Sequence, residues 1–131
     1  MQKSLQARLP PQRGTIDALA FSPAANTLAT GGCDGSVKVW NLGSGAIERT
    51  FSDLHRVCSI AYSPNGRLLA AGAVDYDPHT AWLHLWDLND GSHHELHHPK
   101  TVGSLSFSAD GAALATASGD IVRIWDVTPW L

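Results

Sequence analysis

The chain of 131 residues has the length of one ordinary domain, and its content of 44% hydrophobic and 16% charged residues excludes an intrinsically disordered protein. A formal net charge of −3 gives no electrostatic reason to expect a nucleic acid or an anionic membrane as partner. No apolar run approaches the roughly 20 residues of a membrane helix, and we expect no secretory signal in the first residues. With only two cysteines, we expect reduced thiols in a cytoplasmic protein, with the nucleus as the alternative location.

Three segments of the chain repeat one pattern, at residues 16–42, 57–88 and 102–127. Each segment has an aromatic residue near its start and a tryptophan near its end. These residues are Phe21, Tyr62 and Phe107, and then Trp40, Trp86 and Trp125. A period of about 40 residues is typical of repeat architectures and propellers.

The first segment predicts four short strands. The alternating stretch 16–21 stops at Pro23, because proline cannot donate to a strand ladder. The small apolar stretch 27–32 and the alternating stretch 37–42 follow, with a tight Asp-Gly turn between them. A further Gly turn precedes 46–51, which reads as a fourth strand.

The second and third segments repeat this order. Asn65-Gly66 and Asp110-Gly111 are hairpin dipeptides, because their residues tolerate positive φ. Residues 92–97 are predicted to form the fourth, outer strand of the second segment. The third segment ends after its third strand, and residues 4–9 resemble an unattached fourth strand. No segment has a helical apolar period of useful length, so four strands per unit predict the blades of a β-propeller.

The three segments resemble the Trp-Asp (WD) repeat family of β-propellers. The dipeptide that gives the family its name stands at Trp86-Asp87 and Trp125-Asp126, and Trp40-Asn41 departs from it conservatively. "FSP", "YSP" and "FSA" match the end of the family's first strand. The resemblance covers about residues 14–128. It implies an all-β fold, a partial β-propeller of three four-stranded antiparallel blades.

We expect one propeller segment over residues 1–131, with repeats at about 14–51, 55–97 and 100–128 and with residues 4–9 as an extra outer strand. Single-chain propellers typically need about four to eight blades, so three would leave two apolar blade faces uncovered. Three explanations stay open: a piece of a longer propeller, association with copies of itself, or an isolated arc of marginal stability.

The WD family often carries a hydrogen-bonded set of His, Ser or Thr, Asp and Trp inside a blade, and the resemblance implies such structural clamps here. The matching positions are His98, Thr116, Asp120 and Trp125 in the third unit, Thr30, Asp34 and Trp40 in the first, and Asp75 and Trp86 in the second. Gln12 stands in the histidine position of the first unit, and Ala71 replaces the hydroxyl residue of the second. A buried indole N–H needs an acceptor, so these tryptophans are expected to be structural and not catalytic.

Residues 94–98, "HELHH", match the H-E-x-x-H pattern of zinc proteases. That pattern needs both histidines on one face of a helix. In the predicted strand His94 and His98 lie roughly 13 Å apart, too far to share one Zn²⁺. We therefore expect no catalytic residue, no metal site and no cofactor. The alternative is weak adventitious binding of Ni²⁺, Zn²⁺ or Cu²⁺ among His93, His94, His97 and His98.

The resemblance implies that other proteins bind the loops at the rim of the central channel. The loop 74–82 is longer than its counterparts in the other units, and a tolerated surface insertion is the alternative explanation for its length. The candidate partner-binding residues are Tyr76, Asp77, His79 and Trp82 in this loop, and His55, Arg56 and Lys100 between units.

These observations predict a non-enzymatic scaffold for protein–protein interaction. Its expected partners are other proteins, further propeller blades or copies of itself, and neither nucleic acid nor membrane. Two alternatives remain: a metal-dependent hydrolase that uses His94, Glu95 and His98, and a purely structural module that completes a larger propeller.

Overall fold

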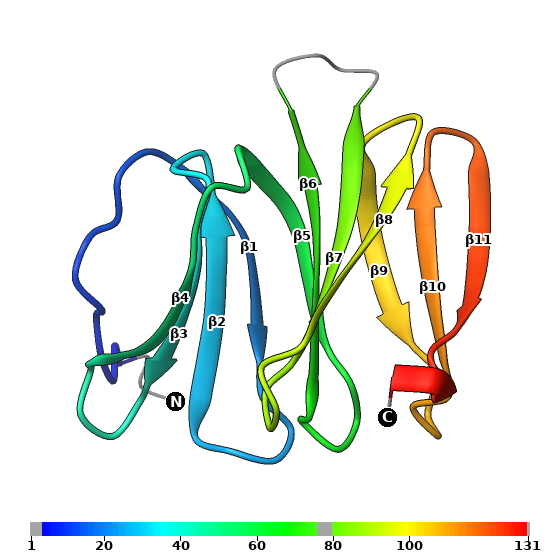
Figure 1. The fold of residues 1–131 in the computed structure, drawn as a ribbon. Helices are drawn as coiled ribbons and strands as arrows, with labels where there is room; N and C mark the ends of the chain where they lie inside the picture. The colour runs from blue at the N-terminus through cyan, green and yellow to red at the C-terminus, as the bar shows by residue number, and fades with distance from the viewer. Residues whose placement is uncertain (1–3, 76–79, 131) are drawn as a thin grey trace.

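The computed structural model describes residues 4–75 and 80–130 of the chain. In this part, eleven strands form three antiparallel sheets (Figure 1). The first sheet contains β1 (Ile16–Phe21), β2 (Thr27–Gly32), β3 (Val37–Asn41) and β4 (Ile47–Phe51). The second contains β5 (Arg56–Tyr62), β6 (Leu68–Val74), β7 (Ala81–Asp87) and β8 (His93–His98). The third contains β9 (Val102–Phe107), β10 (Ala113–Ser118) and β11 (Ile121–Asp126), and a 3₁₀ turn, η1 (Thr128–Trp130), follows it.

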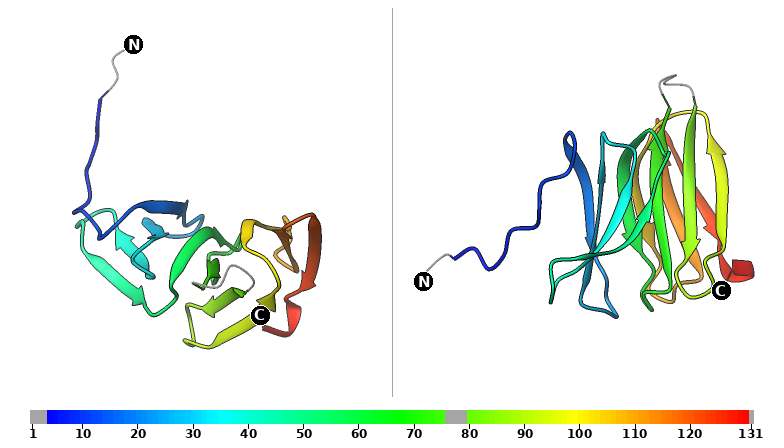
Figure 2. Two further views of the ribbon diagram at one scale, coloured as in Figure 1. Left: turned by 90° about the horizontal axis from the view of Figure 1, so that it is seen from above. Right: turned by 60° about the vertical axis from the view of Figure 1, so that its left-hand side comes forward.

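The three sheets stand side by side in an arc, which is visible from above in Figure 2. Their first strands lie next to one another, β1 beside β5 and β5 beside β9. Each sheet is therefore a blade whose strands run outward in chain order. The predicted all-β partial propeller is confirmed, with the correction that the third blade has three strands. No helix in the described residues is long and apolar enough to cross a bilayer.

The extra strand predicted at residues 4–9 is not formed within this single chain, and its pairing with another copy or blade stays a prediction. These residues form no strand, and the segment runs away from the sheets (Figure 2). A strand forms only beside a sheet edge with unpaired backbone groups. The open edge of the third blade, β11, lies at the opposite end of the arc from this segment (Figure 1).

Two apolar layers hold the arc together. Because side chains alternate along a strand, neighbouring residues of β6 face different blades. Leu69 and Ala71 pack toward the first blade, whereas Leu68 and Ala70 pack toward the third. The first layer contains Ala29, Val37, Val39, Leu54, Val57, Leu69, Ala71, Ala73 and Trp86. The second layer contains Leu68, Ala70, Leu83, Leu85, Leu114 and Val127.

Small residues in the second strand of a blade permit this close packing. A Cβ atom on Gly31 would meet Cγ1 of Val57 at 2.7 Å, and one on Gly72 would meet the carbonyl oxygen of Val102 at 2.7 Å. The hydroxyl of Ser59 also donates to that Val102 carbonyl, at 2.8 Å. The first strand of each following blade therefore packs directly against a glycine in the second strand of the blade before it.

Candidate functional site

Loops from all three blades gather on one side of the arc, where the strand ends lie uppermost in Figure 1. We call this side the loop end. The loops join β2 to β3, β4 to β5, β8 to β9 and β10 to β11, and β6 ends and β7 begins on the same side. His55, Arg56 and Lys100 lie in these connections or at the strand start that follows them. Tyr76, Asp77 and His79 lie outside the described residues.

Trp82 was expected in the long loop, but it lies in strand β7. Its half-buried ring meets the ring of His97 on β8 edge to face, with centroids 5.2 Å apart. The loop is thus shorter than 74–82, because β6 continues to Val74 and β7 begins at Ala81.

Arg56 links the first two blades at the loop end. Its Nε lies 3.2 Å from Oδ2 of Asp17 on β1, and its side chain is still 57% exposed. A solvated ion pair of this kind contributes about 0–1 kcal/mol to stability. The guanidinium therefore still presents polar hydrogen-bond donors to solvent.

Two residues of the loop between β4 and β5 adopt the left-handed backbone conformation, Asp53 with φ 63° and His55 with φ 64°. Nε2 of His55 lies 3.5 Å from Oδ1 of Asp75, just after β6. The structure thus places Asp75, a position of the expected clamp, against the inter-blade loop.

A polar hollow of about 270 Å³ opens beside this pair. We define it by its lining residues, which are Asp53, Leu54, His55, Asp75, Trp82, His84 and Glu95. Three carboxyl groups and two imidazoles face one small space, so the hollow has a negative electrostatic potential whenever its imidazoles are neutral.

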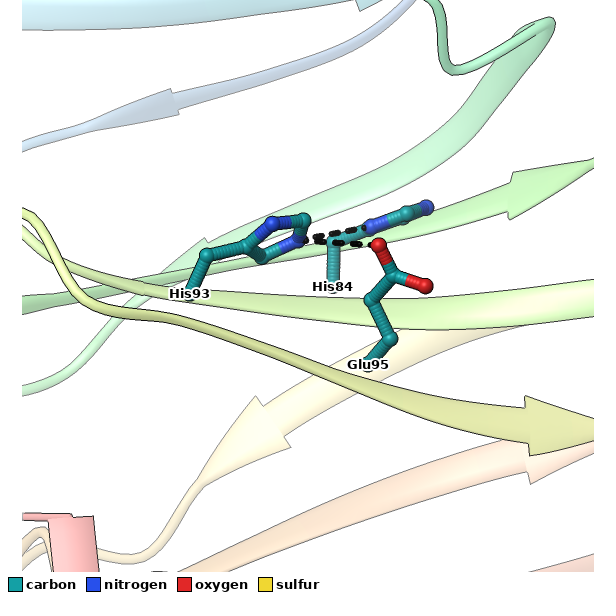
Figure 3. A group of neighbouring side chains, drawn as sticks. All are labelled: His84, His93 and Glu95. Carbon is teal, nitrogen blue, oxygen red and sulfur yellow. Dashed lines mark hydrogen bonds and ion pairs between the residues drawn. The ribbon is translucent and has the colours of Figure 1, made fainter.

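His84, His93 and Glu95 converge at the edge of the hollow (Figure 3). His84 is on β7, directly opposite Glu95 in the strand register, and His93 is two residues before Glu95 on β8. Nδ1 of His84 lies 3.0 Å from Nε2 of His93, and that Nε2 lies 3.9 Å from Oε1 of Glu95. One donor atom from each of the three residues lies within 4.8 Å of the other two.

Burial and the nearby His93 lower the pKa of His84 to about 4. Burial likewise lowers the pKa of His93. Both rings are therefore neutral at neutral pH, and one of the two facing nitrogens carries the proton of their hydrogen bond. That ring must change tautomer before both nitrogens can bind a metal. From the sequence, His93 was expected only as an adventitious ligand and Glu95 only as part of the zinc-protease pattern. His84 had no signal, because its proximity to both depends on the pairing of β7 with β8.

The residues of the "HELHH" stretch fall on two faces of strand β8. Side chains alternate along a strand, so His94 and His98 share one face and Glu95 lies on the other. The ring of His94 stacks on Trp130, with centroids 4.8 Å apart. The three residues of the zinc-protease pattern therefore do not converge on one point.

Three of the four clamp residues expected for the third unit form one hydrogen-bond chain, which joins His98 of β8 in the second blade to Thr116 and Trp125 in the third. Trp125 Nε1 donates to Thr116 Oγ1 at 3.2 Å, and Oγ1 lies 3.1 Å from His98 Nε2. Nδ1 of His98 lies 3.1 Å from the carbonyl oxygen of Leu96 and must donate to it, so Nε2 accepts from the threonine. Asp120 is exposed in the turn and lies outside this chain.

The first blade builds the same chain with glutamine in place of histidine. Trp40 Nε1 donates to Thr30 Oγ1 at 2.9 Å, and Thr30 Oγ1 donates to Gln12 Oε1 at 2.6 Å. Asp34 instead accepts from Lys38 Nζ at 3.0 Å and from the backbone N–H of Ser36 at 3.0 Å. It therefore shapes the turn before β3 and does not bond to the tryptophan.

The second blade, which has Ala71 in the hydroxyl position, holds its tryptophan by stacking. The ring of Trp86 lies 4.4 Å from that of Phe51 and 5.3 Å from that of His93, centroid to centroid. Phe51 belongs to the first blade, so this tryptophan joins two blades. The Phe51 contact has no signal in the repeat pattern.

A protein-family model matches the chain three times along its length. The family model described as "WD domain, G-beta repeat" matches residues 3–41, 47–87 and 91–126. The second match runs from β4 to β7 and the third from β8 to β11, so these two sequence repeats each join the outer strand of one blade to three strands of the next.

Two curated proteins that are similar to this chain are both named as RACK1 proteins of the small ribosomal subunit. "Small ribosomal subunit protein RACK1y" of Oryza sativa subsp. japonica is 37% identical over 119 residues, which are 87% of this chain and 34% of the relative. "Small ribosomal subunit protein RACK1" of Caenorhabditis elegans is 32% identical over 116 residues, which are 86% of this chain and 34% of the relative. The chain spans about a third of the length of these relatives.

Proposed function

The chain belongs to the WD-repeat family of β-propellers, and we propose that it acts as a non-enzymatic scaffold that binds other proteins through its loop end. One observation carries this proposal: connections of all three blades lie together at the loop end (Figure 1). A polar hollow opens there beside the connection between the first two blades. Rigid strands hold these loops in place, and binding residues are commonly found on loops of this kind.

The side chains at the loop end suit a protein partner. Arg56 is mostly exposed, Lys100 is exposed and Trp82 is half-buried. Arginine and tryptophan are enriched where protein interfaces concentrate their binding energy. The net charge of −3 does not favour a nucleic acid phosphate backbone as the principal contact.

The names of the two relatives describe components of the small ribosomal subunit. We therefore propose a protein surface of the small ribosomal subunit as the first partner to test. Cosedimentation of the 131-residue chain with purified small subunits measures this association directly.

The test compares two arginines that each bridge the first two blades. Arg56 lies at the loop end, whereas Arg49 Nη2 donates to the carbonyl oxygen of Leu88 at 2.6 Å, after β7 at the opposite end. We expect Arg56→Ala combined with Lys100→Ala to weaken cosedimentation about tenfold, and Arg49→Ala to leave it within about twofold. No binding by the wild-type chain, or an equal loss in Arg49→Ala, contradicts the proposal.

The uncovered face of the first blade and the uncovered face of the third blade are both apolar, which supports binding to further blades. Val37 and Val39 of β3 are buried against the second blade, but their counterparts in β11, Val122 and Ile124, are both 68% exposed. At the other end Phe21 is 68% exposed, whereas its counterparts Tyr62 and Phe107 pack in the apolar layers.

The open face of the third blade thus corresponds to the buried face of the first blade. The open face of the first blade corresponds to the faces of the second and third blades that pack against the blade before them. We therefore propose that these two faces pack against each other between copies of the chain, or against further WD blades, in a head-to-tail manner.

A further inference from the structure

We propose that His84, His93 and Glu95 form a binding site for a divalent transition metal such as Zn²⁺. Two imidazole nitrogens and one carboxylate oxygen lie within 4.8 Å of one another (Figure 3). This proposal goes beyond the scaffold function and does not depend on it.

The strand register brings the three donors together. Glu95 lies opposite His84 in the antiparallel pair, and His93 shares the face of Glu95 because it is two residues away. All three Cα positions are thus fixed by the backbone hydrogen bonds of β7 and β8. Donors on a rigid hairpin need little rearrangement when a metal binds.

The distances require only small side-chain movements. A tetrahedral Zn²⁺ with bonds of about 2.0–2.1 Å separates its ligand nitrogens by roughly 3.3–3.4 Å. The nitrogens of His84 and His93 are 3.0 Å apart and hydrogen-bonded. The carboxylate of Glu95 starts 3.9 Å from the His93 nitrogen, and its side chain is 50% exposed, so it is free to rotate inward.

Stacked rings hold the two imidazoles in position. The His84 ring lies 5.7 Å from the Trp86 ring and 5.2 Å from the His93 ring, with interplanar angles of 9° and 24°. His84 is also 7% exposed, so its ring has little freedom to leave. The indole thereby supports both nitrogen ligands at once.

The donor set selects the class of metal. Imidazole nitrogens suit Zn²⁺, Cu²⁺ and Ni²⁺, whereas Mg²⁺ and Ca²⁺ prefer oxygen ligands throughout. Three protein ligands leave one position open for water or for a side chain of a partner. The hollow supplies two further carboxyl groups, Asp53 and Asp75, whose charge favours a cation nearby.

This site differs from the one that the "HELHH" pattern suggests. The pattern uses His94 and His98, which lie on the other face of β8 from Glu95. The two sites share only Glu95, so variants of the histidines distinguish them.

Calorimetric titration of the untagged 131-residue chain with Zn²⁺, after dialysis against a chelator, tests the proposal. We expect a phase of one Zn²⁺ per chain that excess Mg²⁺ and Ca²⁺ do not abolish. Glu95→Gln and His93→Gln are each expected to weaken the Zn²⁺ affinity by at least about tenfold. The matched control His94→Gln, on the opposite face of the same strand, is expected to stay within about twofold.

Two results overturn the proposal: the absence of a one-to-one phase in the wild-type chain, and an affinity loss in His94→Gln equal to that in Glu95→Gln. Circular dichroism of each metal-free variant shows whether it is folded. If His93→Gln fails to fold, Glu95→Gln alone decides, because its half-exposed side chain is not part of the apolar layers.

Discussion

The ring of Trp86 in the second blade stacks on the ring of Phe51 in the first, with centroids 4.4 Å apart and planes inclined by 18°. Ala71 cannot supply the hydroxyl that bonds to tryptophan in the other two blades. The contact therefore replaces a hydrogen bond within a blade by an aromatic contact between blades, and such pairs add about 0.5–1.5 kcal/mol beyond the area that they bury.

Removal of this contact should weaken the arc. We expect Phe51→Ala to lower the free energy of unfolding by about 2–3 kcal/mol, because it removes both the apolar area of the partly buried ring and the stacking. Phe51→Leu keeps much of the apolar volume and should cost about half as much. Urea denaturation at one fixed protein concentration measures both, and a loss below about 1 kcal/mol in Phe51→Ala contradicts the expectation.

The hydroxyl of Thr116 serves two partners, so its loss leaves both unsatisfied. We expect Thr116→Val, which keeps the shape of the side chain, to lower the free energy of unfolding by about 2 kcal/mol. The control is Thr128→Val, whose hydroxyl donates to Asp126 in an exposed turn and should change stability by no more than about 0.5 kcal/mol. Equal effects of the two variants would show that the buried chain of hydrogen bonds does not stabilise the blade.

Burial lowers the pKa of His98 below its ordinary value of 6.5, and the positive charge of Arg123 acts in the same direction. As the pH falls below about 6.5, the unfolded chain therefore takes up a proton at this position before the folded chain does. The stability that His98 contributes is complete above that pH and is lost as the pH falls.

His98→Gln tests this dependence with a side chain that the first blade already uses, since Gln12 accepts the equivalent hydrogen bond. We expect the variant to lie within about 1 kcal/mol of the wild type at pH 7, and its stability to fall less steeply from pH 7 to pH 5. The difference between the two profiles isolates this residue from other titrating groups. Parallel profiles would contradict the prediction.

Gly35 makes room for the loop between the first two blades. Its φ is +76°, and a Cβ atom there would lie 2.5 Å from the carbonyl oxygen of His55. We expect Gly35→Ala to lower the free energy of unfolding by about 2 kcal/mol or more. Gly103→Ala, which meets nothing within 4 Å, should change it by less than about 0.5 kcal/mol in the same denaturation experiment. A small effect in Gly35→Ala would contradict both the expected backbone strain at this φ and the close approach of the His55 carbonyl.

The sequence predicts the features that depend on neighbouring residues. Strand boundaries follow from alternation and from turn residues such as Gly66 and Gly111, both of which adopt the expected positive φ. The bonding of Trp40 to Thr30, and of Trp125 to Thr116, involves positions that the repeat pattern aligns.

Features that depend on docking between elements are not predictable from one repeat pattern. The Phe51–Trp86 contact requires two blades to be packed, and the proximity of His84 to His93 requires the register of β7 with β8. Asp34 stays outside its expected clamp for a local reason. Asp34 finds closer donors in its own turn, at Ser36 and Lys38.

The most direct test of the blade packing is the mass of the 131-residue chain in solution, measured by light scattering at increasing concentration. We expect a mass of two or more chains that rises with concentration, because Phe21 at one end and Ile124 at the other present unmatched apolar faces. Ile124→Lys should shift the distribution toward a single chain. A cooperatively folded species with the mass of one chain at every concentration would contradict the proposed pairing of the two faces.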